Sequence, residues 1–159
     1  MLQIRPVELQ DNSKLAETIR TVLIELGVPK VGTAYADTSL DFMFETYRAS
    51  NESYFVITDG DRIVGGAGIA PLANYEGNTC ELQKMYLLAE VRGLGYGMQL
   101  IQTCLDFALA AGFEDVYLET MPYMKNAQKL YAKAGFEYID APLGNTGHSA
   151  CPIYMLRKL

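Results

Sequence analysis

The sequence predicts one α/β domain of the α+β type over residues 1–159, with a mixed, mostly antiparallel central sheet flanked by helices. Three observations support this fold class. Half of the chain (50%) is hydrophobic, and a chain of about 150 residues buries roughly 68–70% of its unfolded surface without needing disulfides or metals. Short β-rich runs follow one another across tight-turn signals, which favours antiparallel pairing. Other segments repeat their apolar residues every three or four positions, as amphipathic helices do.

The N-terminal part predicts a strand and then two helices. Leu2 to Val7 is the first strand. The next segment has its apolar residues on one helical face, namely Leu15, Ile19, Val22, Leu23 and Leu26. Gly27 and Pro29 then end this helix. Thr38 with Asp41 three residues later indicates another helix start. That helix would carry Leu40, Phe42, Phe44 and Tyr47.

The middle of the chain predicts three antiparallel strands. Tyr54 to Thr58 and Arg62 to Ile69 are β-rich runs separated by Asp59, Gly60 and Asp61. An Asp-Gly pair between two such runs is a strong hairpin signal, because glycine readily adopts the positive φ of the tight turn. The third strand is expected from Thr79 to Leu88, after the turn-rich residues 74–78.

The period then changes to that of a helix. Apolar or small residues recur at three and four positions at Gly97, Leu100, Ile101, Cys104, Leu105 and Ala108. This helix should end at Gly112. Val116 to Thr120 returns to a strand, Asn126 to Ala134 is a short helix, and Phe136 to Ile139 and Ile153 to Arg157 are the last strands.

Charge and composition argue against several classes of protein. Thirteen Lys and Arg against nineteen Asp and Glu leave a net charge of −6, so no nucleic-acid partner is expected. No apolar run approaches the ~20 residues that span a bilayer, so we expect no membrane partner and a cytoplasmic location. Three widely spaced cysteines and a single histidine predict reduced thiols and no metal site.

The most informative segment lies between an apolar strand and the start of a long helix. It reads Arg92, Gly93, Leu94, Gly95, Tyr96, Gly97. Glycines let the backbone turn tightly, and the first amides of a helix have no partner within it, so the segment is typical of an anion site. A dinucleotide fingerprint would need glycine at Met98, and the Gly-Lys-Ser or Gly-Lys-Thr of a P-loop is absent. A tight turn without a ligand is the alternative.

Two motifs in this order resemble a known family. The loop from Arg92 to Gly97 matches Arg/Gln-x-x-Gly-x-Gly/Ala, which is similar to the pyrophosphate loop of the GNAT superfamily of acetyl-CoA-dependent N-acyltransferases. Glu81 to Leu87 resembles the fourth strand of that family, and Asn126 to Phe136 resembles its Asn-Ala-x-x-Leu-Tyr-x-x-x-Gly-Phe motif. The specific resemblance covers Cys80 to Phe136, while the order of elements agrees over nearly the whole chain.

The resemblance implies a GNAT-like sheet that splays at its fourth and fifth strands, after Leu87, with acetyl-CoA as co-substrate. The pantetheine arm would lie in the wedge, on main-chain groups of Met85 and Leu87 and beside Asn126. The amides from Gly93 to Gly97, which include Leu94, Gly95 and Tyr96, would hold the pyrophosphate together with Arg92. Lys125 is a further candidate for a CoA phosphate, or else a solvated charge.

The resemblance also implies catalytic roles. Tyr131 occupies the position of the hydroxyl that meets the departing thiolate, so it is the candidate general acid. Glu81 aligns with a strand carboxylate that is the general base in some members. Glu119, on the neighbouring strand, is a competing carboxylate that would also favour a cationic substrate. Glu81 could instead be a solvated strand residue or bind the substrate ammonium, and many members of the family use a chain of waters.

The acceptor site is the least defined. His148 lies in a polar loop and is a candidate substrate contact or a hydrogen-bonded surface residue. Tyr35 and Phe42 are candidates to line the acceptor site or to form core. The leading hypothesis is direct acetyl transfer to the amine of a small molecule or peptide. The alternatives are another acyl donor, a hydroxyl acceptor, or an acyl-CoA sensor without turnover. Family members often pair, so a homodimer is possible.

Overall fold

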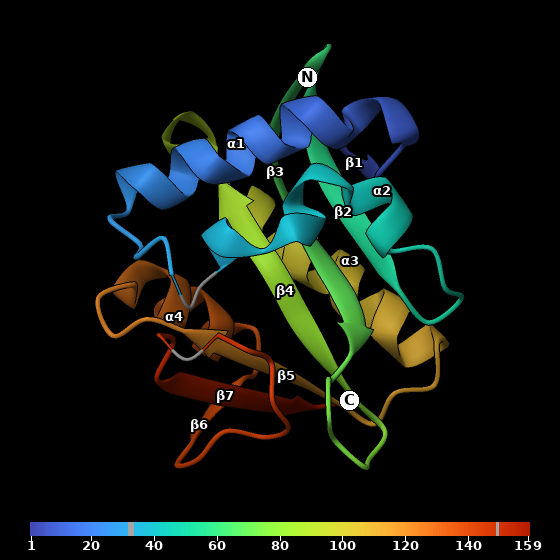
Figure 1. Ribbon diagram of the computed structural model, residues 1–159, viewed down its shortest axis with the longest axis vertical. Helices are drawn as coiled ribbons and strands as arrows, with labels where there is room; N and C mark the ends of the chain where they lie inside the picture. Colours follow the sequence, from blue (N-terminus) through green and yellow to red (C-terminus); the bar gives the residue numbers. More distant parts are fainter. Residues whose placement is uncertain (32–33, 149) are drawn as a thin grey trace.

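A central sheet organises the computed structural model, which describes residues 1–31, 34–148 and 150–159 (Figure 1). Over these residues the sheet has seven strands in the order β1-β2-β3-β4-β5-β7-β6. The strands are β1 (Leu2–Pro6), β2 (Ser53–Asp59), β3 (Arg62–Pro71), β4 (Thr79–Leu87), β5 (Asp115–Thr120), β6 (Glu137–Ile139) and β7 (Ile153–Lys158). Neighbouring strands are antiparallel except β4 and β5, which are parallel. The predicted mixed, mostly antiparallel sheet is confirmed.

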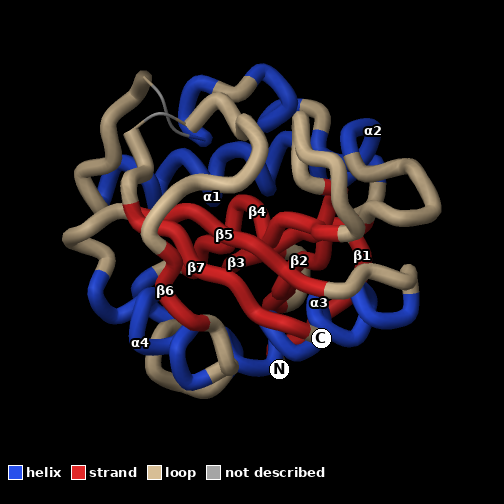
Figure 2. The backbone as a smooth tube through the Cα atoms, turned by 90° about the horizontal axis from the view of Figure 1, so that it is seen from below, coloured by secondary structure: helices blue, strands red, loops and turns tan. Residues whose placement is uncertain are grey.

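Helices cover both faces of the sheet (Figure 2). The two on one face are α1 (Asn12–Glu25) and α2 (Met43–Thr46), and the two on the other are α3 (Tyr96–Ala110) and α4 (Lys125–Lys133). Each face has its own hydrophobic core, because the strands between them point alternate side chains to opposite sides. No helix among the described residues is long and apolar enough to cross a membrane.

The segment after α1 differs from its prediction. The expected helix from Thr38 is broken into a 3-10 turn (Thr38–Asp41) and the four residues of α2. Phe42 interrupts it with φ −134° and ψ 45°, and its side chain is 57% exposed. Leu40 and Met43 are fully buried instead. The core therefore buries two residues that are three positions apart, and the residue that caps the turn is Asp37, whose side chain makes no capping hydrogen bond.

The gap between β4 and β5 opens earlier than expected. The parallel ladder joins only Thr79 to Asp115, Cys80 to Val116 and Glu81 to Tyr117. The prediction that the sheet splays after Leu87 is wrong in its position, because β4 continues without β5 beside it from Leu82 onward. The unpaired edge of β4 is therefore longer than expected, and Glu81 is the last residue of β4 that pairs with β5.

A bulge in β4 shapes the same wedge. Lys84 has φ 50°, and the register against β3 shifts between Gly66 and Gly68. The Tyr54 hydroxyl donates a 2.7 Å hydrogen bond to the Lys84 carbonyl and holds the bulge in place. A bulge adds one residue to a strand, so the residues after it point to the opposite faces. Leu82 and Met85 consequently both pack toward α3.

Candidate active site

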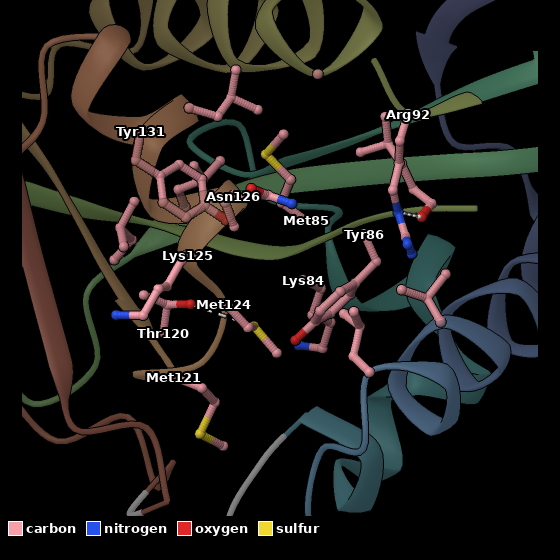
Figure 3. A pocket seen from close by; sticks show the side chains of 18 of the residues that line it. Lys84, Met85, Tyr86, Arg92, Thr120, Met121, Met124, Lys125, Asn126 and Tyr131 are labelled. Atoms are coloured by element: carbon pink, nitrogen blue, oxygen red, sulfur yellow. Dashed lines mark hydrogen bonds between the residues drawn. The ribbon is translucent and has the colours of Figure 1, made fainter. Parts of the chain in front are cut away.

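The wedge between β4 and β5 is a cavity of about 590 Å³. Its walls come from both strands, from the loop before α3, from α4 and from the C-terminal end of α1. Figure 3 shows Tyr131 and Lys125 reaching it from α4, Arg92 from the opposite side, and Met85 between them. Most of the lining is apolar, as for Leu82 and Leu118. The cavity is therefore a long apolar cleft with charged groups at separate places along it.

The glycine loop forms one end of this cleft. Gly93 and Gly95 have φ of 76° and 89°, which side chains rarely adopt. Gly95 is the N-cap of α3, and the amide of Gln99 donates to its carbonyl at 3.3 Å. The amides of residues 96–98 precede that first helical bond, so they have no partner within α3. Gly93, Gly95 and Gly97 line the cleft, whereas Leu94 is 61% exposed and is not part of its lining.

Tyr96 lies apart from the lining as well and packs against the α3-side core. The Tyr96 residue therefore contributes its unpaired backbone amide to the start of α3, and its ring does not line the cleft. Arg92 lines the cleft, but its guanidinium is already engaged by two groups of the protein. Nε donates to the Leu87 carbonyl at 2.9 Å, and Nη1 donates to Glu25 Oε1 at 2.6 Å. Arg92 therefore ties the end of α1 to the end of β4, and it occupies a carbonyl expected to meet the pantetheine arm.

Tyr131 and Asn126 lie on α4 beside the middle of the cleft. The Tyr131 side chain is 8% exposed and meets the Phe136 ring edge-on at 6.1 Å between centroids. Burial raises the pKa of Tyr131 to about 12, so the hydroxyl keeps its proton at neutral pH and serves as a donor. Asn126 and Lys125, in the first turn of α4, line the same cleft.

Two carboxylates and a histidine meet beside the cleft, and of these only Glu119 lines it. Glu81, Glu119 and His148 each bring one ligand-type atom within 4.8 Å of the others. Glu119 lines the cleft and also a second cavity of about 170 Å³. Its carboxylate accepts hydrogen bonds from Thr146 and, at 2.6 Å, from Tyr117. These donor types also suit a divalent cation, so the expectation of no metal stays a prediction.

Glu81 lies behind Glu119. It is 4% exposed and lines neither cavity. Gln83 Nε2 donates to it at 2.7 Å, and the Tyr47 hydroxyl donates to Gln83 Oε1 at 2.7 Å. Burial raises the pKa of Glu81 to about 7, the hydrogen bond from Gln83 opposes this, and Glu119 adds to it. Glu81 is thus half-protonated near neutral pH.

Asp37 joins three separate segments around these carboxylates. Its Oδ2 lies 3.0 Å from His148 Nε2 and 3.5 Å from Lys84 Nζ. Burial acts to raise the pKa of Asp37, but His148 and Lys84 lower it. The bond to Asp37 in turn raises the pKa of His148. Neither Asp37 nor Lys84 was predicted from the sequence. Two polar residues in a row, Gln83 and Lys84, break the alternation of apolar and polar residues along β4 and so indicate the bulge. No local pattern in the sequence indicates the contacts of Asp37.

Tyr35 and Phe42 lie away from both cavities. The Tyr35 ring packs against the α1-side core and has the Lys30 ammonium 5.4 Å and the Arg20 guanidinium 6.0 Å from its centroid. Neither Tyr35 nor Phe42 lines the cleft or the second cavity. Cys151 lines the cleft instead, and burial raises the pKa of its thiol to about 11.

The parting of β4 and β5 beside the start of α3 leaves a cleft with helix amides at one end, an arrangement suited to an anionic ligand. Comparison with known proteins gives the family. Residues 19–136 match the acetyltransferase (GNAT) family, so the chain belongs to that family and is a GNAT-type N-acetyltransferase.

Sequence relatives agree with this assignment. The chain is 42% identical to the Escherichia coli (strain K12) protein named uncharacterized N-acetyltransferase YjgM, over 98% of this chain and 94% of that protein. It is 32% identical to the probable N-acetyltransferase camello of Xenopus tropicalis, over 58% of this chain and 42% of that protein.

Solved structures share the fold. A GNAT-family acetyltransferase from Staphylococcus aureus Mu50 superposes with a TM-score of 0.87 at 20% identity, over 100% of this chain and 99% of that one. The PaiA N-acetyltransferase of Thermoplasma acidophilum, solved in complex with coenzyme A, gives 0.77 at 16% identity, over 100% and 99%. The predicted GNAT-like fold is confirmed.

Proposed function

We propose that the protein transfers the acetyl group of acetyl-CoA directly to a primary amine. One observation carries the proposal: the glycine loop, the Tyr131 side chain and the Glu119 carboxylate all line one continuous cleft. A phosphate-binding end, a proton donor and a carboxylate are the three parts that this transfer needs, and the lining of one cleft includes a candidate for each.

The donor lies with its pyrophosphate on the amides at the start of α3, where the positive end of the helix dipole favours a phosphate. The pantetheine arm follows the free edge of β4 past Met85 and Leu87, with Asn126 on the opposite wall. Lys125 and Lys133 also line the cleft, and they add positive charge along α4. Arg92 acts here mainly by fixing the loop, because both of its hydrogen-bonding partners are protein groups.

The acceptor must lose a proton before it attacks. A primary amine with a pKa near ~10.4 costs about 4.6 kcal/mol to deprotonate at pH 7. In our proposal Glu119 binds the ammonium and Glu81 receives its proton, directly or through one water, since their carboxylates lie within 4.8 Å. A carboxylate with a pKa of about 7 is well matched to this task at neutral pH.

The amine nitrogen then attacks the thioester carbonyl. The new C–N bond forms and the C–S bond breaks, the nitrogen gives up its second proton to water, and the thiolate of CoA takes a proton from the Tyr131 hydroxyl. A thiol with a pKa near ~8.5 needs only about 2 kcal/mol of help at pH 7, so the acid matters less than the base. Tyr131 regains its proton from solvent after release.

A thiol-release assay tests this function. Purified protein with acetyl-CoA and a panel of primary amines should release free CoA only when an amine is present, and mass spectrometry should find the acetylated amine. Release of CoA without any acetylated amine, or acetylation of alcohols in preference to amines, would refute the proposal.

A further inference from the structure

The second cavity lies next to the cleft and shares one residue with it. Its walls are Glu119, Tyr154 and residues of the loop between β6 and β7. Because Glu119 lines both cavities, a molecule in the second cavity lies against the residue that also borders the cleft. This is where the acetyl group and the carboxylates meet in the proposed function.

The charges around this junction are unbalanced. Among the described residues neither Glu81 nor Glu119 forms an ion pair with a basic side chain. The nearest basic groups, Lys84 and His148, are both held by Asp37. Burial makes a charged carboxylate unfavourable unless a cation is near, and Glu119 adds to this effect at Glu81, so an added positive charge at the junction would be favourable. A substrate ammonium supplies it, whereas a hydroxyl does not.

The cavity also offers little to a negative group. Its ionisable lining, over the residues that the structure describes, is limited to Glu119, His148 and the Tyr154 phenol. Three amides of this loop are used internally: that of Gly147 donates to Asn145 Oδ1, that of His148 donates to Thr146 Oγ1, and that of Asn145 donates to the Ala73 carbonyl. A carboxylate in this cavity would have only His148, already paired with Asp37, as a source of positive charge, and it would face Glu119.

We propose that this cavity is the acceptor pocket and that it selects compact primary amines that carry no carboxylate. The volume of about 170 Å³ lies well below the roughly 300–1,000 Å³ of pockets for drug-sized ligands, so only a small body fits inside. This inference rests on the proposed function for its chemistry and adds the class of acceptor.

Three amines with the same four-carbon chain provide the test: butylamine, 1,4-diaminobutane and 4-aminobutanoate. Their reacting amines have similar basicity, so their rates report the charge at the far end. We expect kcat/KM for 4-aminobutanoate to be at least about tenfold below that for butylamine, because its carboxylate faces Glu119. 1,4-Diaminobutane should be at least as good as butylamine. Equal rates for butylamine and 4-aminobutanoate would overturn the inference.

A pair of variants tests the location. Pro142 is exposed and lines the second cavity. Pro142→Lys places a cation at the rim and should raise the rate with 4-aminobutanoate relative to butylamine at least about fivefold. The neutral Pro142→Gln is the matched control and should leave the ratio as it is. A ratio unchanged in Pro142→Lys would mean that the acceptor binds elsewhere.

Calorimetric titration of the three amines into CoA-saturated protein separates this inference from the proposed function. The same order of binding without any acetylation would refute the function and keep the pocket. Acetylation of all three amines at similar rates would keep the proposed function and refute the acceptor pocket.

All reactions contain EDTA, which removes free divalent ions. Activity that needs an added divalent ion would assign the carboxylates and His148 to a metal and overturn the amine pocket.

Discussion

Burial raises the pKa of two titratable side chains at the candidate site, Tyr131 and Glu81, with different consequences near neutral pH. It raises the pKa of Tyr131 to about 12, so this hydroxyl remains a proton donor at all physiological pH values. It raises the pKa of Glu81 to about 7, so this carboxyl exchanges protons near neutrality. Desolvation disfavours the charged form of each side chain, and in the proposed function the resulting states suit Tyr131 as the acid and Glu81 as the base.

The first prediction concerns the acid. Tyr131→Phe keeps the ring against Phe136 but removes the proton donor, so kcat should fall by about tenfold to hundredfold. The dissociation constant for CoA, measured by calorimetry, should stay within about twofold, since the backbone amides of the glycine loop remain. An unaltered kcat would remove Tyr131 from the chemistry.

The second prediction concerns the base. Glu81→Gln cannot accept a proton, so its rate should be most depressed near pH 7. The rate should recover as the pH approaches the pKa of the amine, near ~10.4, where the acceptor loses its proton unaided. The pH profile of kcat/KM for the wild type should rise through about 7. A loss of equal size at every pH would assign Glu81 to substrate positioning.

The third prediction concerns the effect of the same carboxyl on stability. Its pKa is higher in the folded chain, about 7 against 4.5, so folding is favoured most below pH 4.5 and this contribution is lost as the pH rises through 7. Glu81→Gln lacks the charge, so its free energy of unfolding at pH 8 should exceed that of the wild type by about 3 kcal/mol, with no gain at pH 4. Denaturant unfolding at both pH values measures this.

The exposed Glu137→Gln, on β6, is the control for that measurement and should change stability little at either pH. A Glu81→Gln variant no more stable than the wild type at pH 8 would show that the charge of the buried carboxyl does not destabilise the fold.

At the scale of elements, α3 allows a matched test of the phosphate site. Gly95 at its start and Gly112 just after its end have φ of 89° and 91°, and an added Cβ would meet nothing within 4 Å at either. Valine at either position therefore costs a similar strain of about 1–2 kcal/mol. Only Gly95→Val should also weaken CoA binding, by about tenfold or more, because Gly95 lines the cleft. Equal CoA affinities in both variants would contradict the loop assignment.

Local patterns predicted most elements well. The long apolar repeats of α1 and α3 and the hairpin at Gly60 need only neighbouring residues, and the structure has them where expected. The break at Phe42 and the early parting of β4 and β5 after Glu81 depend on tertiary packing. A short segment of sequence carries no information on such contacts. The glycine loop lies at the start of α3 and lines the cleft, where its local pattern placed it, and its role as a phosphate site stays a prediction.

At the scale of the whole molecule, the acceptor side is assembled from distant parts of the chain. Asp37 and His148 are 111 residues apart and lie 3.0 Å from each other. The sequence marked His148 as a candidate but held no sign of its partner, because the contact arises only when the sheet brings two loops together. Glu119 was a candidate by its strand position, and its place between the two cavities required the fold. Pairing into a homodimer stays a prediction.

The central claim is that the parted sheet binds acetyl-CoA through the glycine loop. Calorimetric titration with acetyl-CoA and CoA, beside NAD and 3′-dephospho-CoA, tests it most directly and requires no knowledge of the acceptor. We predict near-stoichiometric binding of acetyl-CoA and CoA, none of NAD, and loss of CoA affinity in Gly95→Val but not in Gly112→Val. Folded protein that binds no CoA species would contradict the account.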